Sequence, residues 1–188
     1  ISDAVTGEIE LKNTTVTVHK QVVDSEGNAY NTPSYNIGKK DTIYFELTAT
    51  IPNFTGYASS GRVFKLTDTL SSGLTYDDIK SVNLEGVSSN LLLNDDYTLT
   101  TPAYDTDTIG GGQLVVDFGS LVNGTATSVE DISQYYGKTV TVIVEAHLNM
   151  NANIATQGSS ELQSDADNSA KGNSNTVRLT YSNNPDNT

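Results

Sequence analysis

The sequence predicts an all-β sandwich. Three observations support this prediction: short runs alternate apolar and polar residues, turn-forming residues separate the runs, and helix signals are weak. The 188 residues are enough for one large domain of this class. We predict eight strands, at 14–23, 41–51, 62–70, 79–84, 96–101, 112–118, 138–149 and 174–182.

The first predicted strand carries a lysine on its apolar face. Side chains alternate between the two faces of a strand, so Val16, Val18, Lys20 and Val22 share one face. Lys20 therefore occupies a position at which a core residue is expected.

The third predicted strand carries an acid in the same way. Phe64, Leu66, Asp68 and Leu70 lie on one face, and Arg62 precedes them on it. Asp68 is thus the second polar residue at a core position.

Two segments after the sixth predicted strand differ from the rest. Residues 128–137 begin with a serine cap and early acids and end at a glycine, which predicts one short helix. Residues 151–173 contain hardly any large apolar side chain. They predict a long exposed loop before the last strand.

The last predicted strand adds a third polar residue to the apolar faces. Asn175 shares a face with Val177, Leu179 and Tyr181. Burying any one of these polar groups without a partner costs several kcal/mol, so three such positions call for a common explanation. The simplest explanation is that Lys20, Asp68 and Asn175 meet.

Such a cluster has its own chemistry. Burial lowers the pKa of a lysine and raises that of an aspartate, so both groups could be neutral. A neutral amine is a nucleophile, and the Asp68 carboxyl could polarise the Asn175 amide and relay the proton that lets ammonia leave. The product would be a side-chain amide. The alternatives are a buried Lys20–Asp68 ion pair that Asn175 hydrogen-bonds, or a different register with some of these residues at a sandwich edge.

Several motifs in this order and spacing resemble one known family. The sequence is similar, from about residue 14 to residue 185, to the isopeptide-forming D2 domain of Gram-positive sortase-assembled pilin backbone subunits. The most specific motif is the last strand with its Tyr-Ser-Asn-Asn-Pro ending. The motifs are Val16-Thr17-Val18-His19-Lys20, Tyr35-Asn36-Ile37-Gly38, Ile51-Pro52-Asn53-Phe54-Thr55-Gly56-Tyr57, Leu66-Thr67-Asp68-Thr69-Leu70 and Asn175-Thr176-Val177-Arg178-Leu179-Thr180-Tyr181-Ser182-Asn183-Asn184-Pro185.

The resemblance implies an Ig-like sandwich of the CnaA type with a self-formed Lys20–Asn175 isopeptide bond. It assigns Asp68 the role of proton relay, and Asn173 is the competing acceptor. Residues 1–13 are then a leading segment, residues 14–185 the single isopeptide-forming domain, and residues 186–188 the start of a linker.

The resemblance also implies a biological role. We expect a structural module of a Gram-positive pilus or adhesin stalk, extracellular and anchored to the cell wall through a longer parent protein. It would be no enzyme beyond this single self-cross-linking event, and its partners would be neighbouring domains and pilin subunits of the same fibre. The sequence lacks a Leu-Pro-x-Thr-Gly signal and a Tyr-Pro-Lys-Asn segment, so the residues used for polymerisation are not assigned.

The alternative function is an adhesin domain that recognises a host glycan or an extracellular-matrix protein. Tyrosines could line such a surface, although tyrosines in sandwich strands more often pack. These are Tyr44, Tyr57, Tyr97, Tyr104, Tyr135 and Tyr136.

Composition argues against several other classes of function. The formal net charge of −13 disfavours nucleic acid and anionic lipid, and no apolar run is long enough to span a bilayer. Cysteine is absent, and His19 and His147 fall on the polar phases of their strands, so we expect no cofactor and no metal site. Asp165 and Asp167 could offer oxygen ligands to calcium, but a solvated loop is the simpler interpretation.

Overall fold

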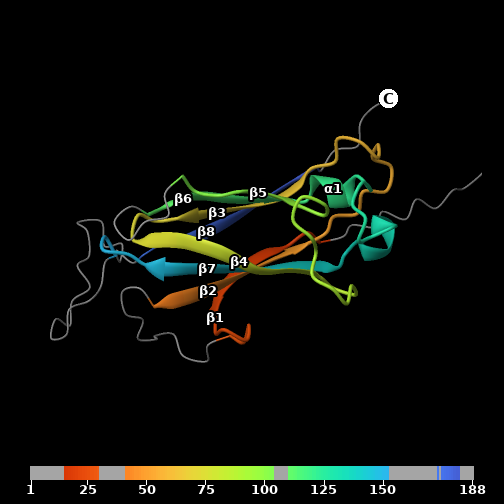
Figure 1. The fold of residues 1–188 in the computed structure, drawn as a ribbon. Coiled ribbons are helices and arrows are strands. Elements are labelled where there is room, and N and C mark those ends of the chain that lie inside the picture. Colours follow the sequence, from red (N-terminus) through yellow and green to blue (C-terminus); the bar gives the residue numbers. More distant parts are fainter. Residues whose placement is uncertain (1–14, 30–40, 104–109, 153–172, 174, 183–188) are drawn as a thin grey trace, which may run out of the picture.

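Two antiparallel sheets of four strands pack face to face (Figure 1). The computed structural model describes residues 15–29, 41–103, 110–152, 173 and 175–182. The all-β sandwich predicted from the sequence is confirmed. The proposed domain limits at residues 13 and 186 lie outside the described residues, as does most of the loop expected at 151–173.

The first sheet has the strand order β1-β2-β7-β4, and every neighbouring pair is antiparallel. Its strands are β1 (Val18–Val23), β2 (Thr42–Thr50), β4 (Leu74–Leu84) and β7 (Thr139–Leu148).

The second sheet has the order β5-β6-β3-β8 and is also antiparallel throughout. Its strands are β3 (Phe64–Leu70), β5 (Thr98–Thr100), β6 (Gly112–Asp117) and β8 (Asn175–Tyr181).

The core lies between the sheets and follows directly from the period-2 pattern. Along β2 the buried side chains are every second residue, Ile43, Phe45, Leu47 and Ala49. Burying each large apolar side chain stabilises the fold by about 1.5–3 kcal/mol. Where the alternation is consistent, as in β2, β3 and β8, it fixes which face of the strand points inward, and with it where a polar residue on that face must lie.

Strand β4 begins five residues earlier than the predicted strand at 79–84. The chain enters it at Leu74, and the register against β7 shifts between Tyr76 and Asp78 and again between Ile79 and Ser81. Each shift is a bulge or irregularity that breaks the alternation of buried and exposed residues. Period-2 analysis therefore detects only the second half of this strand.

The helical segments also differ from the prediction. The segment predicted at 128–137 forms a single 3₁₀ turn, η1 (Ile132–Tyr135), and its cap is Asp131, whose Oδ1 accepts a hydrogen bond from the Ser133 backbone N–H at 2.9 Å. The short α-helix α1 (Gly119–Val122) directly follows β6 and is not foreseen by the sequence. Four residues are too few to show helical periodicity.

Strand β1 begins and strand β8 ends at the same end of the sandwich, the end that carries α1 (Figure 1). At this end Thr50 N donates to Thr17 O at 3.0 Å, and Ser182 N donates to Val63 O at 3.0 Å. Among the described residues no helix is long and apolar enough to cross a membrane.

Candidate cross-linking site

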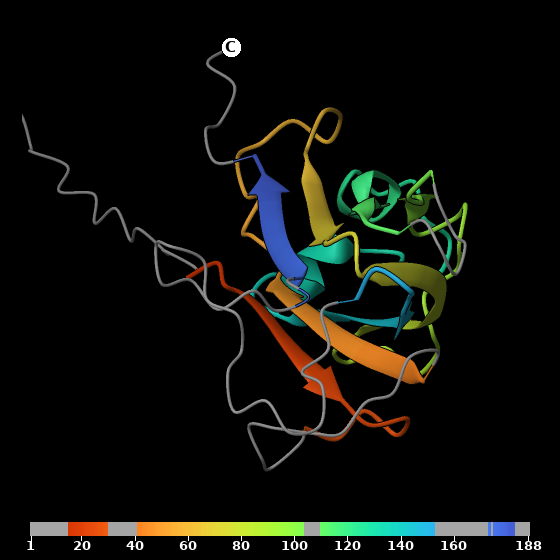
Figure 2. The same ribbon diagram turned by 90° about the vertical axis from the view of Figure 1, so that its left-hand side faces the viewer.

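The candidate site lies where the edges of the two sheets meet. β1 is an edge strand of the first sheet and β8 an edge strand of the second, and the two strands contact each other. Figure 2 shows β1 and β8 on the same side of the sandwich, with β3 inside β8 in the second sheet. An inward side chain on β1 can therefore reach the inward face of β3 and β8.

Lys20 and Asp68 contact each other across this junction. Lys20 Nζ donates a hydrogen bond to Asp68 Oδ1, and the two side chains are only 10% and 1% exposed. Their burial follows from the strand phases, because Leu66, Asp68 and Leu70 alternate with less buried residues along β3. The structure thus brings together the first two residues singled out from the sequence.

Asn175 lies on the same inward face, one step along β8. Asp68 is opposite Val177 in the β3–β8 ladder, and Asn175 is two residues before Val177 and opposite Leu70. Residues two apart in a strand point to the same face, so the Asn175 side chain is diagonal to Asp68.

Three polar atoms at this junction are buried without a hydrogen bond of ordinary geometry. They are Asp68 Oδ2, Asn175 Oδ1 and Asn175 Nδ2. The Asn175 amide nevertheless lies close enough to the Asp68 carboxyl to act on its pKa. Leaving such atoms unpaired costs about 1–3 kcal/mol each, so the site is an unfavourable arrangement for a purely structural polar cluster.

Burial dominates the electrostatics of the pair. Burial lowers the pKa of Lys20 to about 8, against the opposing influence of the Asp68 charge and hydrogen bond. Burial also raises the pKa of Asp68, although the Lys20 charge, the Lys20 hydrogen bond and the nearby Asn175 side chain oppose the shift. Both shifts favour the neutral forms, an amine that can attack a carbonyl and a carboxylic acid that can donate a proton.

Phe45 is a member of this site that sequence reasoning did not identify. The Lys20 Nζ lies 4.7 Å from the centre of the Phe45 ring. In the β1–β2 ladder Lys20 is opposite Leu47, and Phe45 is the diagonal neighbour on the same face. The alternation predicts that Phe45 is buried, but only the register between β1 and β2 places its ring beside the amine.

Asn173, the competing acceptor, lies in a different environment. A Cβ added to Gly73 would come within 2.1 Å of Asn173 Oδ1, so this side chain packs against the turn between β3 and β4. Its contact is with that turn, whereas Asn175 lies in the β8 ladder beside β3.

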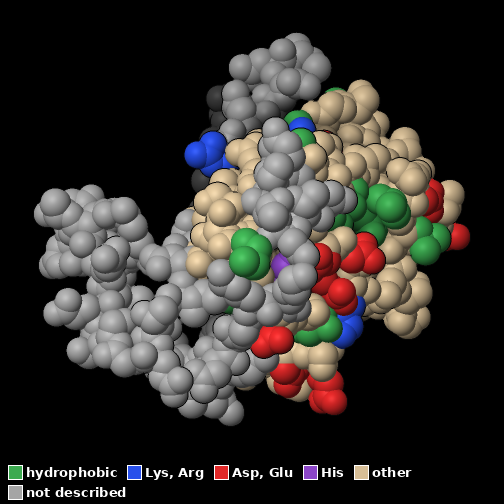
Figure 3. Space-filling model, turned by 60° about the vertical axis from the view of Figure 1, so that its left-hand side comes forward, with side chains coloured by type: hydrophobic (Ala, Val, Ile, Leu, Met, Phe, Trp, Pro, Cys, Tyr) green, Lys and Arg blue, Asp and Glu red, His purple; other side chains and the backbone are tan. Residues whose placement is uncertain are grey.

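The other candidate residues do not form a second site in the described part of the chain. His147 Nδ1 lies 2.8 Å from Asp77 Oδ1, and no group of three or more His, Cys, Asp or Glu side chains there could hold a metal ion. Acidic side chains are numerous on the face drawn in Figure 3. Asp165 and Asp167 lie outside the described residues, as does Tyr104. Of the six tyrosines considered for a glycan surface, Tyr57, Tyr97, Tyr135 and Tyr136 pack in or against the core.

Comparison with solved structures shows the same fold in pilus proteins. The 35 kDa C-terminal fragment of the major pilin GBS80 of Streptococcus agalactiae matches 93% of this chain with a TM-score of 0.55 and 19% identity. The pilus backbone protein RrgB of Streptococcus pneumoniae matches 92% with a TM-score of 0.53 and 22% identity, and the fimbrial protein FimP of Actinomyces oris matches 87% with a TM-score of 0.52 and 19% identity.

The chain has the fold of Gram-positive pilin domains. This confirms the predicted Ig-like sandwich of the pilin type. The chain spans 51%, 32% and 31% of these three structures, respectively, so it is comparable to one part of each. No family model and no curated protein matches the sequence.

Proposed function

We propose that this chain is a structural module of a Gram-positive cell-surface pilus or adhesin stalk, and that a self-formed isopeptide bond between Lys20 and Asn175 stabilises it. One observation carries the proposal: a buried Lys20–Asp68 pair lies between the two sheet edges, next to a buried Asn175 amide that has no hydrogen-bond partner. The pilin fold of the chain supports the same role.

The bond would form in one addition and one elimination. The neutral Lys20 amine attacks Cγ of Asn175 while the protonated Asp68 carboxyl donates its proton to Asn175 Oδ1. Asp68 then accepts a proton from the attacking nitrogen and passes it to the Asn175 nitrogen, which leaves as ammonia while the Oδ1 hydroxyl returns its proton to Asp68 and the carbonyl re-forms. One C–N bond forms and one breaks, Asp68 regains its proton, and no water or cofactor is consumed.

The reaction would also remove the unfavourable features of the site. The amine whose pKa burial lowers becomes an uncharged amide, and its N–H and C=O groups can hydrogen-bond with the Asp68 carboxyl. A closed loop of about 155 residues stabilises the fold by up to roughly 5 kcal/mol in the chain-entropy model developed for disulfides. The bond would join the two sheets at the edge where no backbone ladder joins them.

The similarity in fold to pilin structures supports a role in a surface fibre. A module of this kind would act with neighbouring domains and pilin subunits, outside the cell and attached to the wall through its parent protein. A covalent tie between the two sheets suits a domain that must keep its structure in a surface fibre.

The mass of the intact protein tests the bond directly. We expect the wild-type chain to be one ammonia lighter than its sequence requires, and a proteolytic digest to contain one branched peptide that joins the segments around Lys20 and Asn175. A wild-type protein of full mass would refute the covalent bond.

The role of Asp68 has a matched control in the same sheet. Asp68→Ala should leave the protein at full mass, because the amine and the amide lose their proton relay. Asp117→Ala should still lose one ammonia, since Asp117 pairs with the half-exposed Lys65 at 3.0 Å, away from the proposed bond. Complete bond formation in Asp68→Ala would remove Asp68 from the mechanism.

A further inference from the structure

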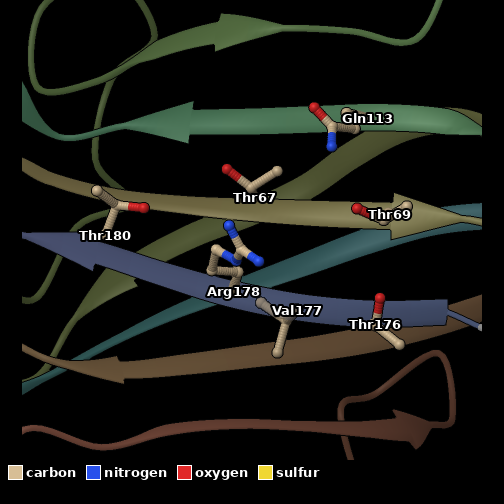
Figure 4. A pocket seen from close by; sticks show the side chains of 7 residues that line it. All are labelled: Thr67, Thr69, Gln113, Thr176, Val177, Arg178 and Thr180. Atoms are coloured by element: carbon tan, nitrogen blue, oxygen red, sulfur yellow. The ribbon is translucent and has the colours of Figure 1, made fainter.

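The outer face of the second sheet carries a groove with a volume of about 450 Å³. It lies across three neighbouring strands, with Gln113 on β6, Thr67 and Thr69 on β3, and the rest of its lining on β8 (Figure 4). The threonine, glutamine and arginine side chains of its lining point away from the Lys20 site, because outward and inward residues alternate along these strands, and only Val177 belongs to the inward face. The lining residues on β8 are Thr176, Val177, Arg178 and Thr180.

Arg178 is the only ionisable residue in the lining of this groove. Its side chain is exposed and extends from β8 toward β3, on the side of Thr67 (Figure 4). In the β3–β8 ladder Thr67 is directly opposite Arg178, and Thr69 is opposite Thr176. The guanidinium is therefore surrounded by hydroxyl groups rather than by carboxylates.

The other described cations are engaged, and Arg178 differs from all of them. Each of the other five donates a hydrogen bond to a carboxylate or a carbonyl oxygen, whereas Arg178 makes no hydrogen bond or ion pair in the described part of the chain. These five are Lys20, Arg62, Lys65, Lys80 and Lys138. In a protein with a formal net charge of −13, an unpaired guanidinium is the unusual feature of this face.

We propose that this groove binds a carboxylate-bearing saccharide, such as a sialic acid or a uronic acid residue. A guanidinium presents a planar set of donors that matches both oxygens of a carboxylate. Threonine hydroxyls both donate and accept hydrogen bonds, as does the Gln113 amide, and sugar hydroxyls need partners of both kinds. The volume falls within the range of about 300–1,000 Å³ that small-molecule sites occupy.

An acidic peptide fits the same groove less well. A peptide bound in extended form gains affinity from a strand edge and specificity from pockets for its side chains. Here the groove lies on the face of the sheet, and Val177 is the single apolar residue of its lining. Arg178 can pair with a carboxylate of either ligand, but the hydroxyl groups of the lining favour a sugar acid over an acidic peptide. The proposal is independent of the isopeptide bond.

The test uses sialyllactose as the probe and lactose as its neutral match, each titrated into the wild-type protein and followed by NMR. We expect saturable shifts with sialyllactose, a Kd of about 1 mM or tighter, and changes confined to β3, β6 and β8. Lactose should bind at least about tenfold more weakly, because it lacks the carboxylate. Equal binding of both sugars, or no saturable binding of sialyllactose and of a glucuronic acid disaccharide, would overturn the proposal.

Two variants and one control assign the binding to the groove. Arg178→Gln should weaken sialyllactose binding about tenfold or more, and Thr69→Val, which keeps the side-chain shape, should weaken it severalfold. Lys138→Gln makes the same change in net charge at a distant exposed ion pair and should leave the Kd unchanged. Equal weakening by Lys138→Gln would reduce the effect to net charge and contradict the proposal. Tighter binding of a Glu-rich tetrapeptide than of sialyllactose would contradict the saccharide proposal and indicate an acidic peptide as the ligand.

The mass of each variant separates this test from that of the proposed function. A protein that has lost one ammonia but binds no sugar acid would contradict only the groove proposal. A protein of full mass that binds sialyllactose through Arg178 would contradict only the bond.

Discussion

Arg62 and Lys20 both carry a positive charge into the edge of the core, but their surroundings differ. Arg62 lies just before β3, and its guanidinium donates to three backbone carbonyls. Nε donates to Ala58 O at 2.9 Å, Nη2 to Tyr57 O at 2.9 Å and Nη1 to Val122 O at 3.0 Å. The guanidinium carbon lies 5.7 Å from the centre of the Phe54 ring.

Lys20 has a single hydrogen-bond acceptor by comparison. Asp68 Oδ1 accepts from its amine, while Asp68 Oδ2 and both polar atoms of Asn175 stay buried without partners. An arginine remains charged at any pH that proteins tolerate, so its site must satisfy it with hydrogen bonds. A lysine can lose its proton, and burial here lowers its pKa to about 8.

The difference separates a cation held by several hydrogen bonds from one whose surroundings fit the proposed reaction. Each of the three guanidinium nitrogens of Arg62 donates to a backbone carbonyl. The Lys20 cluster has three buried polar atoms without hydrogen bonds, and burial shifts the pKa values of Lys20 and Asp68 toward their neutral forms. The proposed reaction needs these forms, since Lys20 would be the nucleophile and Asp68 the acid that acts on Asn175. Unpaired buried atoms at the Lys20 site, and their absence around Arg62 among the described residues, are therefore the feature on which the proposed reaction of Lys20 rests.

Removing the acceptor of the proposed bond should have the largest effect. Asn175→Ala leaves the Lys20–Asp68 pair in place but prevents the cross-link, so the protein should keep its full mass. The free energy of unfolding should fall by up to about 5 kcal/mol and Tm by roughly 10–20 °C. Calorimetry on the variant and the wild type measures this. An unchanged Tm would show that the bond is absent or does not contribute to stability.

Arg62→Met should destabilise without affecting the cross-link. The substitution leaves the part-buried carbonyls of Tyr57 and Val122 without their donor, and a loss of about 3 kcal/mol is expected. The mass should still be one ammonia below the sequence value, because the Lys20 site is unchanged. Urea unfolding measures the loss in the free energy of unfolding, and mass spectrometry measures whether one ammonia has been lost. A full-mass Arg62→Met protein would show that the two regions are coupled.

The pH dependence of the uncross-linked Asn175→Ala variant should reveal the buried amine. Lys20 has a pKa of about 8 in the folded protein against 10.5 as its ordinary value. Between these pH values the unfolded chain binds the proton more strongly, so stability should rise with pH, by about 1–3 kcal/mol between pH 8 and 9.5. Asp68, with its raised pKa, should act oppositely above its ordinary value of 3.8, where stability falls as pH rises. Urea unfolding across pH measures both slopes.

A second substitution provides the control for this pH dependence. Adding Lys20→Met to Asn175→Ala should abolish the rise above pH 8, since no amine remains to titrate at the site. If stability still rises above pH 8 in the double variant, the rise comes from another titratable group.

The smallest effect is expected at an exposed ion pair. Lys65 Nζ lies 3.0 Å from Asp117 Oδ2, and the two side chains are 36% and 34% exposed. Lys65→Ala should change the free energy of unfolding by about 0.5 kcal/mol or less, because solvent screens such pairs. A loss of several kcal/mol in urea unfolding would show that charge pairing outside the core matters more than the comparison of Arg62 with Lys20 implies.

Strand phase explains why much of the candidate site could be predicted from the sequence. Asp68 and Asn175 interrupt regular alternations, and regular alternation fixes which face of a strand is buried. Strand β1 is less regular, because Val18 on the Lys20 face is 40% exposed and Val23 on the opposite phase is buried. Two irregularities in β4 break the alternation, so its first half escaped detection. The position of Phe45 beside Lys20 depends on the register between strands, which no single-strand pattern encodes. The bond itself stays a prediction.

The common end at which β1 starts and β8 finishes has a mechanical consequence. With the proposed bond in place, a pulling force applied before β1 and after β8 would run from Val18 to Lys20, across the bond, and along β8 from Asn175 to Tyr181. Strands β2 to β7 would lie outside this load path and would bear little of the applied force. The module would then transmit tension through two short strand segments, while the other strands keep their structure under force.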